Sequence, residues 1–125
     1  MNNKINKLSA EELKEVTGGN NDNTMTEGIA GAYGGSDDSG KTTATGETVD
    51  DSSMGVAIPV SWPNYRSYFG RKILINYCGM TVHATINDAG VLSGRNLDLQ
   101  PGIFRSFGCN SCADWGIRTI SYCIL

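Results

Sequence analysis

Short stretches in which apolar and polar residues alternate are the main pattern of residues 28–125, here called the body. The clearest are 72–77 (KILINY) and 80–86 (MTVHATI), two β-rich runs separated by Cys78 and Gly79. This pattern predicts a β-hairpin. Alternation groups the apolar side chains on one face of each strand, Ile73, Ile75 and Tyr77 on the first and Val82, Ala84 and Ile86 on the second.

The rest of the body predicts further short strands and one short helix. Strands are expected from Gly28 onwards, within 54–60, at 95–99 and at 117–125. Residues 87–90 (NDAG) have the composition of a turn. Many short strands with regular glycine turns are typical of a small β-barrel.

The short helix is expected over 101–108. Pro101 opens it and Gly108 ends it, and its apolar face consists of Ile103, Phe104 and Phe107. Trp115 is expected in the core, and His83 on a strand, facing solvent or a partner strand.

The first nineteen residues differ from the body. Residues 4–16 (KINKLSAEELKEV) carry an apolar stripe at helical spacing, and Gly18 and Gly19 end the pattern. An isolated helix of this length is marginal in water, so it needs a partner, either the body or a processing enzyme. Residues 20–27 are polar and predict a flexible linker.

The segment LSAEELKEVTGG resembles the double-glycine leader of peptides exported by Gram-positive bacteria. In that class an ABC exporter with a cysteine-protease domain reads the helix and cuts after the second glycine. The resemblance implies cleavage between Gly19 and Asn20 and a mature protein outside the cell. The alternative is a solvated helix with a glycine cap. The segment lacks the continuous apolar region of a secretory signal peptide.

Composition and charge narrow the function classes. The chain has 125 residues and a net charge of −3, without a cluster of lysine and arginine, which argues against a nucleic-acid partner. No apolar run is long enough for a transmembrane helix. The charge is uneven, because 20–51 carry seven acids and one base, whereas 52–125 carry three acids and six bases. Nothing indicates a nucleotide, flavin or haem, so no cofactor is expected.

All four cysteines lie in the body, at Cys78, Cys109, Cys112 and Cys123. An even number in an exported protein indicates up to two disulfides, with the pairing left open. Free thiols, a redox pair in the CxxC motif, and a zinc site are the alternatives. The chain has no second CxxC motif and only one histidine, His83, so a four-ligand zinc site would need Cys78 and Cys123 as well, and no metal is expected.

Three motifs in order resemble the RlpA-like (rare lipoprotein A) double-psi β-barrel group, which is related to expansins and barwin. GIAGAYGG followed by TTATGE (28–47) is similar to the family's opening G-x-A-S-Y-Y-G and T-A-[NS]-G-E. VHATINDAG (82–90) is similar to V-x-V-R-I-N-D-R-G, and GRNLDL (94–99) to G-R-x-I-D-L-S. The resemblance covers 28–125 and implies a mainly β fold, a six-stranded double-psi β-barrel with short helices, behind the leader (1–19) and the linker (20–27).

Bacterial members of this group act on peptidoglycan glycan strands, often as lytic transglycosylases. Such an enzyme needs a carboxylic acid that protonates the glycosidic oxygen and then takes a proton from the sugar's own 6-hydroxyl. The resemblance carries this catalytic role to Asp88 and a second acidic position to Glu47, in one groove. The family's third polar position, a histidine, falls on Ile58 here and is missing.

Each polar candidate also has a structural interpretation. Asp88 suits a turn or a helix cap, and Glu47 lies in a polar stretch where acids are usually solvated. Arg95 either contacts the substrate or pairs with an acid. Asp98, in the LDL motif, is mostly structural in the family.

The aromatic segment 61–70 (SWPNYRSYFG) supplies the other binding candidates, Trp62, Tyr65, Tyr68 and Phe69. These rings either stack on sugars or close one end of the barrel. The flanking Arg66, Arg71 and Lys72 either meet anionic wall polymers or keep the surface soluble.

The sequence thus predicts a secreted protein that acts on the cell wall of a Gram-positive bacterium, with peptidoglycan as its partner and lytic transglycosylase cleavage as its activity. Two alternatives stay open. A non-catalytic peptidoglycan-binding or expansin-like loosening module is favoured by the missing histidine. A bacteriocin-type toxin or signalling protein that uses the barrel as a scaffold is favoured by the leader.

Overall fold

The computed structural model describes residues 25–35 and 41–125 of the chain. The predicted leader, with Gly18 and Gly19, lies outside these residues, as does most of the predicted linker. Both assignments therefore stay predictions.

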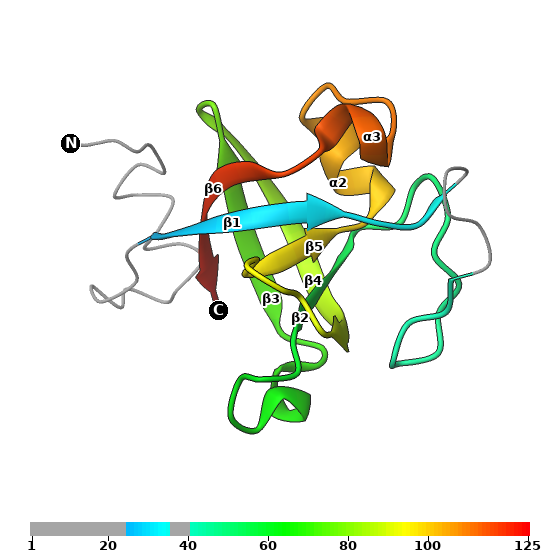
Figure 1. The fold of residues 1–125 in the computed structure, drawn as a ribbon, viewed down its shortest axis with the longest axis vertical. Coiled ribbons are helices and arrows are strands. Elements are labelled where there is room, and N and C mark those ends of the chain that lie inside the picture. The colour runs from blue at the N-terminus through cyan, green and yellow to red at the C-terminus, as the bar shows by residue number, and fades with distance from the viewer. Residues whose placement is uncertain (1–24, 36–40) are drawn as a thin grey trace.

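Six strands form a closed barrel in the described residues (Figure 1). They are β1 (Thr26–Ala32), β2 (Gly55–Pro59), β3 (Lys72–Tyr77), β4 (Met80–Gly90), β5 (Leu97–Leu99) and β6 (Arg118–Ile124). Around the barrel the order is β1, β5, β2, β4, β3, β6, and β6 pairs with β1 to close it. The β1–β5 and β2–β4 pairs are parallel, and the others are antiparallel. This architecture confirms the predicted fold class, a mainly β, six-stranded barrel of double-psi type with short helices.

The predicted hairpin is present. β3 and β4 pair antiparallel from Lys72 opposite Thr85 to Tyr77 opposite Met80. Cys78 and Gly79 form the turn, with φ of 50° and 80°. Two residues with positive φ give the twist that a tight hairpin needs.

The turn predicted at residues 87–90 is wrong, because β4 continues as a strand to Gly90. On its far side β4 pairs in parallel with β2, and this non-local pairing overrides the local turn composition. Val56 lies opposite Ile86 and Ala57 opposite Asp88, so Asn87 is the extra residue of a β-bulge. A bulge re-aims the side chains beside it, which gives this segment its place in the site described below.

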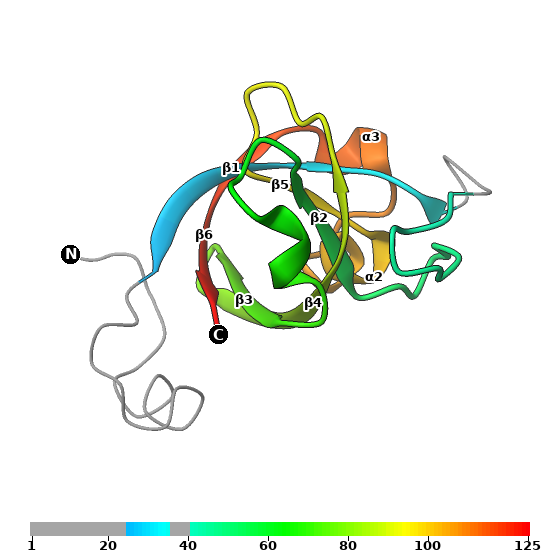
Figure 2. The same ribbon diagram turned by 90° about the horizontal axis from the view of Figure 1, so that it is seen from below.

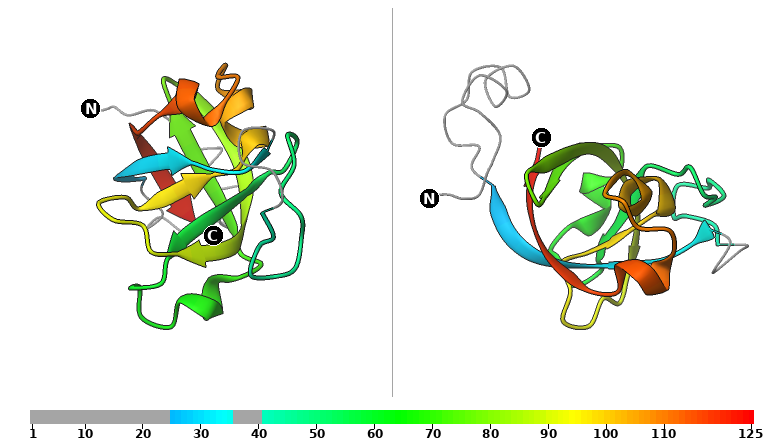
Figure 3. Two further views of the ribbon diagram at one scale, coloured as in Figure 1. Left: turned by 45° about the vertical axis from the view of Figure 1, so that its right-hand side comes forward. Right: turned by 90° about the horizontal axis from the view of Figure 1, so that it is seen from above.

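Short helices lie at the two ends of the barrel. The 3-10 helix η2 (Tyr65–Tyr68) belongs to the β2–β3 connection, which crosses one end (Figure 2). α2 (Pro101–Ser106) and α3 (Cys112–Trp115) lie together at the other end (Figure 3). α2 confirms the predicted helix, whereas η2 and α3 are too short to leave a periodic pattern. None of the helices in the described residues is long and apolar enough to cross a membrane.

Inward-facing apolar side chains fill the barrel. For the two hairpin strands, the alternation of apolar and polar residues correctly predicted which face is buried. Ile73, Ile75, Ala84 and Ile86 are buried, and Tyr77 and Val82 pack against them. The predicted apolar face of α2 closes the core with Ile103, Phe104 and Phe107.

Trp115 lies in the core, as predicted, with 1% of its surface exposed. Its indole Nε1 donates a hydrogen bond to the carbonyl oxygen of Ala30 at 3.0 Å, so α3 is tied to β1. The ring stacks on Phe107 and meets Tyr77 edge to face. The polar tip of the indole is thereby satisfied inside an apolar cluster.

The expected disulfides are not formed in the structure. All four cysteines are described, and none is in a disulfide. They belong to different surroundings, because Cys78 is exposed at the β3–β4 turn, Cys109 is buried between α2 and α3, Cys112 begins α3, and Cys123 is buried in β6. Burial raises the pKa of the Cys123 thiol, which keeps it in the less reactive protonated form.

We expect Gly55→Ala to destabilise the barrel. A Cβ at position 55 would touch the side-chain amide of Asn87 and lie 2.5 Å from Oε1 of Gln100. Overpacking of this kind costs about 1–3 kcal/mol of the free energy of unfolding. Chemical denaturation measures this loss. The matched variant Gly90→Ala, whose Cβ would meet Leu92 at 3.6 Å, should change stability much less, and equal effects would contradict the prediction.

Candidate functional site

Asp88 lies near the C-terminal end of β4, directly after the bulge. Its Oδ1 accepts hydrogen bonds from the backbone N–H groups of Ala44 and Ala89, both at 2.9 Å. Its Oδ2 accepts one from the Tyr33 hydroxyl at 2.7 Å. Donors from three parts of the chain therefore hold the carboxylate in place.

Tyr33 lies just after β1 and is the one of these three donors that binds Asp88 through its side chain. Burial, and then the hydrogen bond to Asp88, raise the pKa of Tyr33 well above its ordinary value. The phenol therefore stays protonated and keeps its hydrogen for the carboxylate.

Glu47 lies on the neighbouring loop, residues 41–50. Its Oε1 accepts hydrogen bonds from the hydroxyls of Thr45 at 2.7 Å and Thr43 at 3.1 Å, and from Nδ2 of Asn87 at 3.0 Å. The Thr45 hydroxyl, followed by that of Thr43, holds the pKa of Glu47 below its ordinary value of 4.5. Glu47 is thus ionised at neutral pH, whereas a general acid for glycoside cleavage needs a raised pKa.

One buried amide links the two acids. Gln100 is 1% exposed, and its Nε2 donates to Oδ1 of Asn87 and to the Tyr33 hydroxyl, both at 2.8 Å. Because Asn87 donates to Glu47 and Tyr33 donates to Asp88, hydrogen bonds connect the two carboxylates without a break.

The two carboxylates nevertheless open into different hollows. One hollow of about 270 Å³ is lined by Tyr33, Ala57, Asp88, Leu92, Arg95 and Asp98, among others. Another of about 430 Å³, the Glu47 hollow, is lined by Glu47, Asp50, Met54, Thr85, Asn87 and Gln100, among others. No residue lines both. Glu47 and Asp88 are therefore linked neighbours that line separate hollows, whereas the sequence analysis expected them in one groove.

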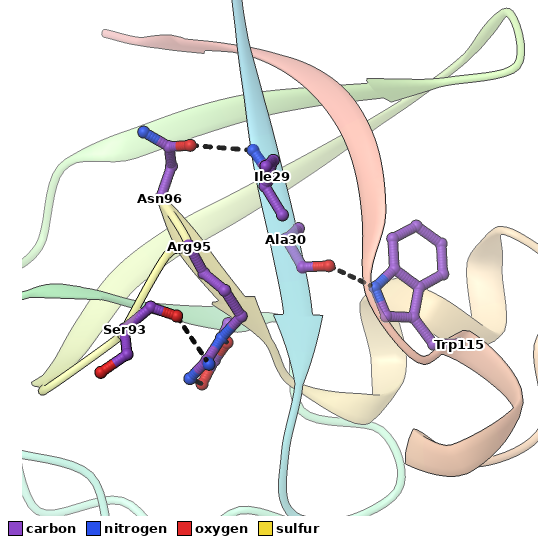
Figure 4. A network of polar contacts seen from close by, with 7 residues as sticks. Ile29, Ala30, Ser93, Arg95, Asn96 and Trp115 are labelled. Atoms are coloured by element: carbon purple, nitrogen blue, oxygen red, sulfur yellow. Dashed lines mark hydrogen bonds and ion pairs between the residues drawn. The ribbon is translucent and has the colours of Figure 1, made fainter.

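Arg95 and Asp98 form a fork-like ion pair beside Asp88. Nε of Arg95 lies 2.6 Å from Oδ1 of Asp98, and Nη2 of Arg95 lies 3.0 Å from Oδ2 of Asp98. A side chain at position 31 would displace this pair, because a Cβ would lie 2.7 Å from Oδ1 of Asp98 and 2.9 Å from Cδ of Arg95. Figure 4 shows Arg95 beside β1, where the next residue, Asn96, accepts a hydrogen bond from the N–H of Ile29.

The ion pair joins the Asp88 hollow to a second one across β1. This second hollow, also about 270 Å³, is lined by Gly31, Ala32, Arg95, Asp98, Gly116 and Ile117. Since Arg95 and Asp98 line both hollows, we treat the two together as the Asp88 furrow. Val91 and Ile117, which line one hollow each, are 81% and 65% exposed, the highest values among large apolar residues in the described segments.

The predicted aromatic candidates lie elsewhere. Trp62, Tyr65 and Tyr68 belong to the β2–β3 connection and pack against the core. None of them lines the Asp88 furrow or the Glu47 hollow. Of the predicted binding residues, Arg95 is therefore the one that shares a furrow with Asp88.

The position that corresponds to the family's histidine supplies no polar side chain. Ile58 is fully buried in β2 and belongs to the core. His83 is exposed on β4, as predicted for a strand residue facing solvent.

Sequence reasoning missed Asn87 and Gln100, which organise the site. In the sequence, Gln100 is a polar residue between the LDL strand and the apolar start of α2. A polar side chain between two buried elements could have indicated a buried hydrogen-bonding role. In the described residues, no group of three or more His, Cys, Asp or Glu side chains is placed to hold a metal ion. The chemistry the furrow offers is that of fixed carboxylates, a guanidinium and a phenol.

Comparisons with known proteins support the fold. No family model matches the chain, and no curated protein matches its sequence. Among solved structures, a Streptomyces papain inhibitor is similar, with a TM-score of 0.59 and 23% sequence identity. The similarity covers 82% of this chain and 94% of that chain. At this identity the likeness shows a shared barrel fold and leaves the activity open.

Glu47 should contribute to stability only where it is ionised. Its pKa is lowered in the folded protein, so the contribution is present above the unfolded value of 4.5 and is lost as the pH falls through the lower folded value. Thermal melts of the protein and of Glu47→Gln between about pH 7 and pH 3 test this. The two melting temperatures should differ at neutral pH and converge in acid. A difference in melting temperature that stays the same at every pH would contradict a stabilising role of the ionised Glu47 carboxylate.

Proposed function

We propose that the protein is an exported binding protein that holds a cell-wall glycan strand in the Asp88 furrow without cutting it. The observation that carries this proposal is the meeting of three sequence motifs in one furrow. Tyr33 comes from AYGG, Asp88 from IND, and Arg95 and Asp98 from GRNLDL. The proposal that the protein is exported rests on the predicted double-glycine leader. The choice of a glycan strand as the ligand rests on the resemblance to the RlpA-like group.

The furrow suits the hydroxyl groups of a polysaccharide. Asp88 offers a carboxylate that accepts hydrogen bonds, and Arg95 offers a guanidinium that donates them. Both are held by neighbouring groups before a ligand arrives, so little side-chain freedom is lost on binding. The exposed Val91 and Ile117 can pack against the C–H faces of sugar rings.

The same geometry argues against cleavage. A lytic transglycosylase needs a carboxylic acid that gives its proton to the glycosidic oxygen, whereas Asp88 already accepts three hydrogen bonds from fixed donors. Glu47 opens into the other hollow, and its pKa is lowered rather than raised. Ile58 in the core supplies no third polar group. We therefore favour binding over the transglycosylase reaction.

Purified glycan strands, stripped of anionic polymers, should bind the protein, and Arg95→Gln should weaken binding. Losing a charge-assisted hydrogen bond to the ligand corresponds to roughly a tenfold rise in Kd. Isothermal titration calorimetry measures the Kd of the unmodified protein and of Arg95→Gln for the glycan strands. Arg105→Gln is the matched control, because Arg105 is exposed near Asp51, at 3.9 Å, and lines neither part of the furrow.

Mass spectrometry of the same mixtures separates binding from cleavage. The proposal expects no anhydro-sugar ends after prolonged incubation. Anhydro ends that vanish in Asp88→Asn would establish a transglycosylase instead. Equal affinity of Arg95→Gln and Arg105→Gln for the strands would remove the furrow as the binding site.

A second candidate function is inhibition of a cysteine protease, favoured by the similarity to the Streptomyces papain inhibitor. Exposed apolar residues beside a fixed arginine, such as Val91 and Ile117 beside Arg95, also suit a protein partner. The glycan proposal expects papain to keep its activity at protein concentrations that saturate the glycan. Stoichiometric inhibition of papain that Ile117→Ser abolishes would support the second candidate in its place.

A further inference from the structure

The β2–β3 connection and the start of β3 are rich in positive charge. Residues 52–87 contain no Asp or Glu, and Arg66, Arg71 and Lys72 lie within seven residues of one another. All three side chains are exposed. In the segments that the structure describes, none of them forms an ion pair with an acidic side chain.

Aromatic rings hold two of these cations in position. The guanidinium carbon of Arg66 lies 4.9 Å from the centre of the Tyr65 ring, and that of Arg71 lies 5.4 Å from the centre of the Tyr68 ring. Each ring is itself fixed by an edge-to-face contact, Tyr65 with Phe69 and Tyr68 with Trp62. Cations that are already ordered lose less freedom when they bind an anion.

A shallow hollow of about 590 Å³ lies beside Arg66, lined by Asn64, Tyr65, Arg66 and Ser67. Asn64 has a φ of 55°, which turns the backbone into η2. Arg71 and Lys72 each make a hydrogen bond along the barrel wall, to the Leu125 carbonyl oxygen at 2.9 Å and to the Thr85 hydroxyl at 2.7 Å. The surface thus combines donors and cations.

We infer that residues 60–72, here called the cationic surface, form a second binding site that takes a polyanionic chain of the polyol phosphate type. Guanidinium groups match phosphate oxygens in shape and charge, and several fixed cations along one connection match a chain with repeated charges. The residues that line its hollow are absent from the Asp88 furrow. The inference therefore stands apart from the proposed glycan binding.

An anionic membrane is a poorer fit than a soluble polymer. Trp62, Tyr65, Tyr68 and Phe69 are half-buried and pack against the core. Within 60–72, Val60 is the large hydrophobic residue whose side chain is exposed, at 40%. A segment that enters a lipid interface presents a continuous apolar face, which this connection keeps turned inward.

Calorimetry with synthetic poly(glycerol phosphate) as the probe tests the inference. The protein should bind this polymer at low salt, and added salt should weaken binding because exposed charges are screened. Arg66→Gln should raise Kd by roughly tenfold. Arg105→Gln, which removes the same charge outside the surface, should leave Kd unchanged.

The outcomes distinguish the two sites and the two kinds of anion. Arg95→Gln should bind the polymer normally while losing affinity for neutral glycan strands. Equal weakening by Arg66→Gln and Arg105→Gln would overturn the inference, since net charge alone would then explain binding. It would also be overturned by tighter binding to phosphatidylglycerol vesicles than to the polymer, or by equal affinity for uncharged dextran.

Discussion

The hydrogen bonds of one buried side chain, Gln100, determine the geometry of the whole site. Its Oε1 accepts the N–H of Gly55 at 3.1 Å, and its Nε2 donates to Tyr33 and Asn87. Four segments therefore meet at this amide: the chain after β1, the start of β2, the bulge of β4 and the end of β5. A buried amide without these partners would be costly, so the four segments are fixed relative to one another.

This junction also decides what the two acids can do. Asn87, the extra residue of the bulge, turns toward Glu47 and Gln100, while Asp88 takes its donors from Tyr33 and two backbone N–H groups. Each carboxylate is thereby held in its own hollow. An arrangement that orders both carboxylates so firmly suits the recognition of a polar chain.

Local patterns in the sequence correctly predicted the elements that form from neighbouring residues, namely a hairpin and a short helix. Alternation identified the hairpin and its buried faces, and Pro101 and Gly108 bounded the helix that contains α2. The turn expected at 87–90 failed because parallel pairing with β2, which joins residues about thirty positions apart, outweighs composition. The Gln100 junction is hidden for the same reason, since its partners at 33, 55 and 87 are distant in sequence. The family resemblance singled out Asp88, Arg95 and Glu47 as candidates and expected the two acids in one groove, whereas Asp88 and Arg95 line one hollow and Glu47 lines another.

Residue-resolved NMR during a titration with purified glycan strands tests most directly whether the Asp88 furrow binds without cutting. The account predicts amide shifts concentrated at Gly31, Arg95 and Ile117, and sugar signals that stay unchanged on standing. Shifts confined to the Glu47 hollow, or new anhydro-sugar signals that grow with time, would contradict it.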